Sequence, residues 1–548
     1  MASQGELLKA RYDRLLARRQ PYEWIRQEVA EYVLPHRAVI GESATEGASR
    51  TDKIFDATAM HANALLGARI HGALFNPAAK NFTMATRDAA LNKDYGIRKW
   101  FDAAETAMQL AINLSNFSSA AHEVCLETPA LGTSALYAEE RLPKTKGFNG
   151  LNFRSFSLSE FVIDENADGE VDTLMRAFKL SARAAVRKWP GCSAGTREKA
   201  EKKPEELVDF LHAMYPRETK DATTPTPAEK KAWASIYMEL KPLLIVEEGG
   251  MEECPFGVIR WSLTPGEVYG FGPGMAARPD IKTLNKSVEL FLQQWALAIQ
   301  PPVFTTLNNC VGSPQFTPGS RIPVRRLDAI REFVTNARFD VTMAGIEGLR
   351  KAVRDMFFGP QLELKASPEM TATEVAARMQ LMNQFLGPVS GRFMSELLTP
   401  ILIRCFGIMS RFQGAGAPFP PVPPRLQAYV KAQGDFEIRY LTPMARQQRQ
   451  PELAAIERFT QMLLATQQLH PAGLDRIDFD GALGEAADIL GVPASVLRSD
   501  QELATVRAAK AQVQEQAAQL AAMQSVAQAA GQAAPMVSAI SKAQGNGG

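Results

Sequence analysis

Four short motifs in the sequence could carry chemistry, and two of them involve metal ligands. His122-Glu123 begins the zinc-binding pattern H-E-x-x-H, but Leu126 stands where the second imidazole is needed. The run Asp164–Gly169 begins like a calcium loop, but Met175 occupies the twelfth position, where a bidentate glutamate is required. We therefore predict no metal at either place, and a polar turn between two strands at 164–169.

The other two motifs are rich in glycine. Gly270–Gly274 (GFGPG) lacks the Gly-Lys-Ser/Thr of a phosphate-binding loop, and that tripeptide occurs nowhere in the chain. Gly191–Gly195 fits the string G-x-S-x-G, but a nucleophile elbow follows a buried strand, whereas a basic helical stretch precedes this string. We predict a hinge before a helix at the first segment and a surface turn at the second. No catalytic or cofactor-binding residue is predicted.

The composition limits the class of protein further. The 548 residues include 61 Lys+Arg and 60 Asp+Glu, so a net charge of +1 excludes a polycation that coats nucleic acid by bulk charge. Five cysteines without a C-x-x-C pair are typical of a reducing compartment. The best candidate for a membrane span, Leu397–Met409, is short and contains Arg404. We therefore expect an intracellular, multi-domain protein without disulfides, metal or membrane span.

The hydrophobic spacing predicts a mainly α-helical protein with a smaller β component, an α+β fold. Helical periodicity covers 6–34, where Pro21 could divide the helix in two. Further helices are expected at 53–75 and 97–140, strands at 150–180 and 231–272, and an exposed charged insertion at 195–230.

Two long helical stretches flank a segment rich in proline and glycine. The first covers 280–300 and the second 328–358, and the segment between them contains the strand-like pieces Val303-Phe304 and Ile322–Val324. Such a projecting hairpin has too little local sequence to bury its own apolar residues. It needs neighbouring chains, which a cyclic assembly would provide.

Two capping boxes mark the starts of later helices. Thr371–Glu374 begins a long helix, in which Pro388 and Pro400 are expected to cause kinks. Ser499–Glu502 begins a segment rich in alanine and glutamine, and residues 511–535 hold ten Ala and seven Gln. This composition favours a helix but gives it little apolar surface. Either that helix frays, or several copies of it pack against one another.

Several sequence blocks, taken in order, resemble the portal proteins of short-tailed bacteriophages, which are head-to-tail connectors. The resemblance covers most of residues 6–460 and rests on the order of the blocks. The blocks are RYDRLLARRQPYEWIRQEVAEYVLP, DATAMHANALLGARIHGALFNP, SEFVIDENADGEVDTLMRAF, GFGPGMAARPDIKTLNKSVE, TATEVAARMQLMNQFLGPVSGRFMSELLTPILIRCFGIM and FEIRYLTPMARQQRQPE.

The resemblance implies a ring of twelve copies around an axial channel at one capsid vertex of the virion, after assembly in the host cytoplasm. Double-stranded DNA would pass through the channel without sequence specificity. The implied partners are the terminase large subunit, tail adaptor and tail proteins, and the major capsid and scaffolding proteins. The resemblance implies no enzymatic activity, cofactor or membrane. Its map gives a wing at 1–275 and 372–425, stem helices at 276–300 and 328–358, a clip at 301–327, a tunnel loop at 359–371, a crown at 426–499, a C-terminal barrel helix at 500–531 and a flexible tail at 532–548.

Basic residues gather in one part of this map. Residues 321–354 contain eight basic and four acidic side chains. The candidates for contact with DNA phosphates are Arg325, Arg326, Arg331 and Arg338. The alternative is an exposed helix face with ion pairs within and between subunits.

The implied tunnel loop and clip supply the other candidates. Gln361 and Lys365 are expected to face the lumen, unless the neighbouring leucines fold the segment into a strand against the wing. Phe304, Phe316 and Arg321 are expected to contact the tail adaptor or the terminase, with a place in the clip core as the alternative for Phe316.

Two other protein classes compete with the portal interpretation. A nucleic-acid-processing enzyme subunit would require a carboxylate cluster or a phosphate-binding loop, and the sequence shows neither. A cytosolic scaffold or adaptor protein could use the Ala/Gln helix to form small or open assemblies. Closed rings with a central hole would favour the portal.

Overall fold

The computed structural model describes residues 3–40, 50–75, 82–141, 147–217, 231–300, 303–306, 317, 321–324, 339–359, 387–412, 417–433, 436–440, 452–462, 478–490, 492, 498 and 502–520. These residues form a mixture of helices and mainly antiparallel sheets, which confirms the predicted α+β class. The helices are α1 (Gln4–Val33), α2 (Thr58–Leu74), α3 (Ala89–Lys93), α4 (Tyr95–Asn113), α5 (Phe117–Leu131), α6 (Ala182–Lys188), α7 (Ala194–Lys202), α8 (Pro273–Ala276), α9 (Arg278–Ile299), α10 (Phe339–Met356), α13 (Thr399–Ser410), α14 (Pro424–Gln433) and α16 (Phe479–Leu490).

The strands are β1 (Phe82–Thr86), β2 (Thr133–Glu140), β3 (Leu151–Phe156), β4 (Phe161–Glu165), β5 (Val171–Ser181), β6 (Leu207–Pro216), β7 (Trp233–Glu239), β8 (Leu244–Met251), β9 (Phe256–Arg260), β10 (Val303–Thr306), β11 (Arg321–Val324) and β12 (Phe436–Tyr440). The chain divides into two compact units. The first comprises 1–83, 104–419 and 438–455, and the second comprises 84–103, 420–437 and 456–548.

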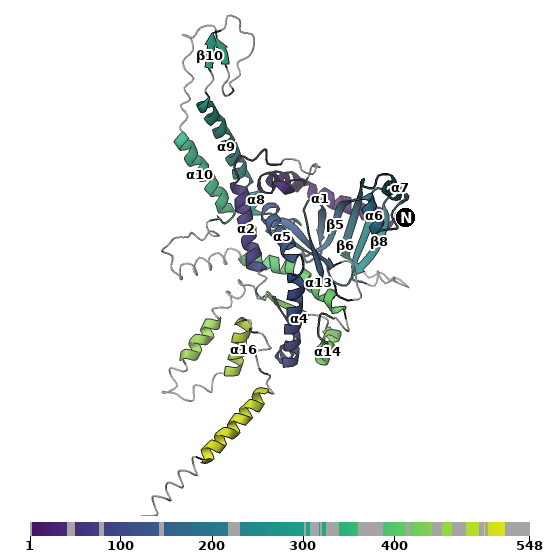
Figure 1. Cartoon of the computed structure of the whole chain (residues 1–548), viewed down its shortest axis with the longest axis vertical. Helices are drawn as coiled ribbons and strands as arrows, with labels where there is room; N and C mark the ends of the chain where they lie inside the picture. The colour runs from purple at the N-terminus through teal and green to yellow at the C-terminus, as the bar shows by residue number, and fades with distance from the viewer. Residues whose placement is uncertain are drawn as a thin grey trace, which may run out of the picture. The chain divides into compact units, whose positions relative to one another are not determined.

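The larger sheet of the first unit has the strand order β4-β5-β6-β7-β8, and all its neighbouring strands are antiparallel (Figure 1). Helix α1 covers one face, where Leu8 and Leu15 join a core that includes Met175. On the other face, Trp189 at the end of α6 packs with Phe210. Because both faces are covered, residues 210–214 of the central strand β6 are all buried rather than alternating between buried and exposed.

A smaller sheet has the order β3-β2-β9, with β2 in the centre. Helix α5 leads into β2 through Gly132, whose φ of +79° closes the helix in the left-handed region that glycine adopts at low cost. Contacts of α5 with β2 and β3 bury one face of this sheet.

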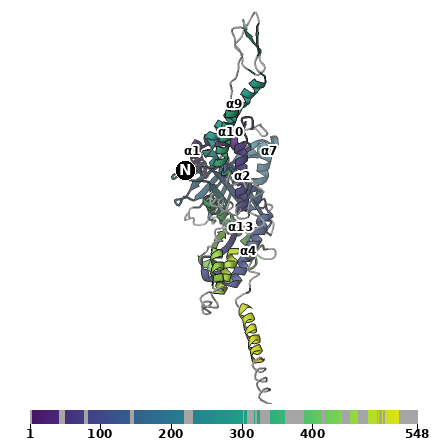
Figure 2. The same ribbon diagram turned by 90° about the vertical axis from the view of Figure 1, so that its left-hand side faces the viewer.

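Helices α9 and α10 lie side by side (Figures 1 and 2). Between them in sequence, β10 pairs with β11 in parallel, with Val303 opposite Arg321. The predicted helix 280–300 and both predicted strand pieces are confirmed. Of the predicted helix 328–358, the part in α10 is confirmed, and residues 328–338 lie outside the described residues.

One helix, Gly387–Ser410, is long and apolar enough to cross a membrane by length and composition alone. More than half of its most apolar window is buried inside the protein, and its last turns pack against β2 and β9. These are the contacts of a core helix. It contains a π-helical turn, Phe393–Leu398, directly before α13.

The second unit contains α14, α16 and the helical residues 502–520. Within this unit the indole of Trp100 donates a hydrogen bond to the Pro420 carbonyl, at 3.0 Å. Arg507 of the last helix pairs through both terminal nitrogens with the Asp480 carboxylate of α16, at 2.7 and 2.8 Å. The predicted helical character of 502–520 is confirmed.

Three sequence predictions in this region of the fold were wrong. Residues 133–140 form strand β2 rather than the end of a helix, because Gly132 ends α5. Residues 207–216 form β6, inside the larger sheet, rather than an exposed insertion. Pro21 lies within α1 without dividing it, since the helix is continuous over 30 residues.

Candidate functional site

The outer half of α9 is the most unusual surface among the described residues. Ile281, Leu284 and Val288 bury one stripe of its first half, as expected for a helix that packs on a core. Farther along, apolar side chains lie on several sides of the same helix and are exposed. These are Leu290 (49%), Leu292 (40%), Trp295 (53%) and Ile299 (65%). A helix that is apolar on all sides is typical of a buried helix, so this segment needs a cover that the described residues do not supply.

The inner ends of α9 and α10 are held by one polar cluster, which we call the helix-pair anchor and define as Asp56, Asn285 and Arg350. The Asn285 side-chain oxygen accepts hydrogen bonds from the backbone amides of Phe55 and Asp56, at 3.0 and 3.1 Å. The Asp56 carboxylate accepts a hydrogen bond from Nε of Arg350, at 2.8 Å. A single loop residue thereby joins both long helices to the body of the first unit.

Charge stabilises this anchor. Burial alone would raise the pKa of Asp56, but hydrogen bonds from Thr58 and from the Arg350 guanidinium lower that pKa below its ordinary value. Asp56 is nearly fully buried, so removal of Arg350 would leave an unpaired charge in a poor environment. A second cluster joins α9 to α1, where Glu28 accepts hydrogen bonds from Arg278 and Lys282, at 2.7 and 2.9 Å.

The basic residues of α10 are mostly paired. Arg350 and Arg354 both contact Glu347, at 3.4 and 2.5 Å. Lys351 is exposed and makes no ion pair with any residue that the structure describes. For this part of the basic segment, the alternative of an ion-paired helix face therefore holds for two of the three cations.

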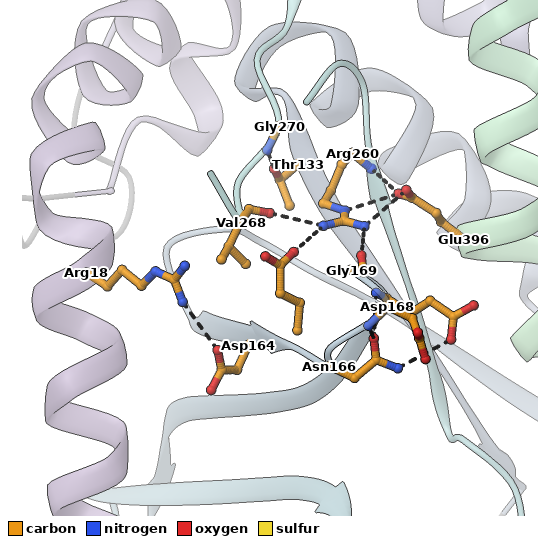
Figure 3. A network of polar contacts seen from close by, with 12 residues as sticks. Arg18, Thr133, Asp164, Asn166, Asp168, Gly169, Arg260, Val268, Gly270 and Glu396 are labelled. Atoms are coloured by element: carbon orange, nitrogen blue, oxygen red, sulfur yellow. Dashed lines mark hydrogen bonds and ion pairs between the residues drawn. The ribbon is translucent and has the colours of Figure 1, made fainter. Parts of the chain in front are cut away.

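Arg260, at the end of β9, is the most highly connected buried charge in the described chain, with 2% of its side chain exposed (Figure 3). Its guanidinium donates to Glu396 of the π turn, Glu165 of β4 and the Gly169 carbonyl, at 3.2, 3.1 and 2.8 Å. The Val268 carbonyl accepts the longest bond, at 3.5 Å. A buried arginine is tolerated when its donors find acceptors, and this one joins β9 to the β4–β5 hairpin and to the π turn, which are distant in sequence.

The calcium-like segment is part of this network. The Asn166 side chain accepts hydrogen bonds from the amides of Asp168 and Glu170, both at 2.9 Å, and Gly169 has φ of +79°. Asp164 is directed toward Arg18 of α1 (Figure 3). The predicted polar turn between two strands is confirmed. The Gly169 carbonyl of this turn accepts a hydrogen bond from Arg260.

The two glycine motifs are structural. Gly270 lies so close to Gly132 that a Cβ on Gly270 would stand 2.3 Å from the Gly132 carbonyl oxygen. This close backbone packing takes the place of the predicted hinge. Ser193 of the G-x-S-x-G string caps α7 by accepting a hydrogen bond from the Thr196 amide, which agrees with the predicted surface turn. Among the described residues, no group of His, Cys, Asp and Glu could hold a metal ion.

Few of the sequence-predicted site residues can be placed. Phe304 belongs to β10 and Arg321 to β11, so the structure brings their backbones into adjacent strands. The others lie outside the described residues: Phe316, Arg325, Arg326, Arg331, Arg338, Gln361 and Lys365. The helix-pair anchor and Arg260 were not predicted. Glu165 lies 95 positions from Arg260, and Asp56 lies 294 positions from Arg350, so no local motif reveals these pairs.

Comparison with known families decides the class of this architecture. The family model of the bacteriophage head to tail connecting proteins matches residues 5–497. The chain belongs to this family. It is 27% identical to a probable portal protein of Bordetella phage BPP-1 over 548 residues, covering 95% of this chain and 94% of that protein. It is 25% identical to a portal protein of Salmonella phage epsilon15 over 493 residues, covering 86% and 85%.

Membership of the connector family fixes the broad function. Head-to-tail connectors are structural proteins of the phage particle rather than enzymes, and they have a portal function at the capsid vertex. They are oligomeric and interact with capsid, terminase and tail components. The incomplete catalytic motifs of the sequence and the structural roles of the two glycine segments agree with such a connector.

Proposed function

We propose that copies of this connector form a closed ring around an axial channel, through which double-stranded DNA is packaged and later ejected. The observation that carries the proposal is the outer half of α9, which exposes apolar side chains on several sides beyond the helix-pair anchor. In a ring, each helix pair has a neighbour on both sides, so a cyclic assembly covers such a surface. The number of twelve subunits follows from the resemblance to portal proteins.

The parts of the ring follow the same order along the chain. Residues 1–275 and 372–425 form the wing, and 276–300 and 328–358 form the stem, with the helix-pair anchor at the junction between wing and stem. The clip is 301–327, the tunnel loop 359–371, the crown 426–499, the barrel helix 500–531 and the tail 532–548. The two sheets and α1 support the wing assignment, and the adjacent helices α9 and α10 support the stem.

Contacts with DNA in this channel are sparse and independent of base sequence. The ion pairs of Arg350 and Arg354 with Glu347 support this, because they remove two cations from the set available to phosphates. The proposed phosphate contacts are Arg325, Arg326, Arg331 and Arg338, joined by Gln361 and Lys365 of the tunnel loop. Dense basic binding would oppose the sliding of DNA.

The clip carries the external partners in this proposal. Phe304, Phe316 and Arg321 contact the terminase large subunit during packaging and the tail adaptor afterwards. A pair of short strands, β10 and β11, has little stability alone, which supports a role completed by neighbours. Assembly with capsid and scaffolding proteins takes place in the host cytoplasm.

Imaging of purified protein tests the ring. Wild-type particles should show closed rings with a central hole, whereas Trp295→Glu should yield monomers or open fragments because it places a charge in the proposed contact. Gln294→Glu is the matched control, since it adds the same charge to the neighbouring exposed position. Intact rings from Trp295→Glu would exclude the stem contact, and small open assemblies of the wild type would favour the scaffold alternative.

A further inference from the structure

The π-helical turn Phe393–Leu398 interrupts an otherwise regular core helix. The amide of Thr399 donates to the Met394 carbonyl five residues earlier, where an α-helix would use the fourth residue. Pro400 follows directly. In an α-helix its ring would crowd the carbonyl of residue 396, so the wider turn relieves a steric conflict that the sequence builds in.

One side of this turn is held by a buried charge. Glu396 accepts three hydrogen bonds from Arg260, from the backbone amide, Nε and Nη2, at 3.1, 3.3 and 3.2 Å. Arg260 is itself fixed by Glu165 and by the Gly169 carbonyl. Arg260, which the wing sheets fix in place, therefore holds Glu396 at one position along the helix.

The widened backbone is held by a second contact. The Met394 carbonyl accepts hydrogen bonds from the hydroxyls of Thr399 and Tyr440, both at 2.9 Å, in addition to the Thr399 amide. Tyr440 comes from β12, and its hydroxyl also lies within hydrogen-bond distance of the Thr399 hydroxyl. A carbonyl with this many donors would lose them if the turn became α-helical.

The packing around the turn is tight on one side and open on another. A Cβ on Gly257 of β9 would stand 2.5 Å from the Leu397 carbonyl oxygen, so the strand touches the turn backbone to backbone. A cavity of about 70 Å³ lies beside Leu398, Leu402 and Tyr440, and its lining is mainly apolar. This space gives the turn room for a second arrangement.

We propose that the π turn is a register latch, in which Arg260 through Glu396 and Tyr440 through the Met394 carbonyl hold the core helix one residue out of α-helical register. Releasing the two contacts loosens the turn, and relief of the Pro400 conflict as well returns it to α-helix. The π turn holds one residue more than an α-helical turn. When the turn becomes α-helical, the preceding helix rotates by about 100° and shifts by about 1.5 Å relative to the wing. The latch thus couples the wing sheets to the rotation of that helix about its own axis.

The preceding helix moves because the following one is fixed. Helix α13 buries Ile401, Cys405 and Ile408 against the wing, whereas Arg392 and Gly391 at the other side of the turn are more accessible. The inference concerns a single chain and does not depend on the number of subunits in the ring.

Hydrogen exchange of the purified full-length protein tests the latch. The double variant Glu396→Gln with Tyr440→Phe should exchange the amides of 394–399 on the order of tenfold faster than wild type, while 403–409 in α13 remain protected. The matched control is Glu160→Gln, which weakens another arginine–carboxylate pair, that of Arg176 with Glu160 at 2.7 Å, without touching Arg260 or the helix. In this control the amides of 394–399 should exchange as in wild type. Adding Pro400→Ala supplies the missing amide, and a density map of that triple variant should show a continuous α-helix.

Two results would overturn the proposal. One is equal exchange at 394–399 in the double variant and in Glu160→Gln. The other is a π turn that persists in the density of the triple variant. If the double variant does not fold, Tyr440→Phe alone decides the matter, because it removes a single hydroxyl, and unchanged exchange in that variant counts against the latch.

Discussion

At the scale of single residues, buried polar side chains hold the first unit together. Arg260 is fully satisfied by surrounding acceptors, and Asp56 is held by Arg350 and Thr58. His212 is a different case, because it lies buried between strands, stacked on the Tyr237 ring at 3.9 Å and hydrogen-bonded to the Ser235 hydroxyl, at 2.9 Å. Burial first, and then the charges of Arg176, Lys188 and Arg154, lower its pKa to about 3.

This shift predicts acid lability of the wing. The unfolded chain binds a proton at the ordinary histidine value of 6.5, whereas the folded chain does so only near pH 3. Stability is therefore complete above pH 6.5 and is lost as the pH falls toward 3, by up to about 1.4 kcal/mol per pH unit. The melting temperature should fall over this range, and the fall should be shallower in His212→Gln.

Exposed His61 provides the control for the acid experiment, because His61→Gln changes a histidine that is not buried. Its melting temperature should follow that of the wild type at every pH. Parallel curves for wild type and His212→Gln between pH 6.5 and 4 would show that another group causes the acid loss.

The residues that form the buried networks could not be predicted from sequence. Arg260 reads as one charge at the end of a strand, and its acceptors Gly169, Glu165 and Glu396 lie 91, 95 and 136 positions away. The candidates that the sequence did supply, such as Lys365 and Arg325, rest on the resemblance to portal proteins and lie outside the described residues. They remain predictions.

At the scale of elements, local signals worked where an element has one apolar side. Helices α1, α2 and α9 follow their apolar stripes, and the capping box at Ser3 and Glu6 fixes the start of α1. The local pattern did not predict strand β2, because Thr133 to Ala138 are all buried and show no alternation of buried and exposed residues. Only tertiary burial on both faces distinguishes such a run from a helix.

Gly132, at the junction of α5 and β2, gives a prediction for an element boundary. Gly132→Ala adds backbone strain at φ +79° and a Cβ 2.2 Å from the Gly270 carbonyl oxygen. Gly266→Ala adds comparable strain at φ +85° but meets nothing within 4 Å. We expect a loss of about 1 kcal/mol for Gly266→Ala and of more than about 3 kcal/mol for Gly132→Ala, measured by chemical denaturation. Equal losses would mean that the segments at 132 and 270 are not in close contact.

At the scale of the whole molecule, charge and exposed apolar surface both favour association with neighbouring protein chains over general binding of nucleic acid. A net charge of +1 leaves no general attraction for nucleic acid, and two of the three described α10 cations, Arg350 and Arg354, are ion-paired with Glu347. Exposed apolar side chains gather on the outer half of α9. The sequence predicted a helical hairpin that needs neighbours, and the structure shows which side chains create that need.

The C-terminal helix allows a last prediction about the whole particle. Residues 502–520 are helical and almost entirely exposed, and the ion pair of Arg507 with Asp480 is itself exposed. A helix rich in Ala and Gln buries little apolar area, so it adds little to the stability of a single chain. Ring closure should instead depend on the wing and the stem. A chain ending at Arg498 should therefore still form closed rings, which lack an inner barrel and package or retain less DNA. Images of the truncated protein measure this directly, and monomers or open fragments would show that the helix is required for ring assembly.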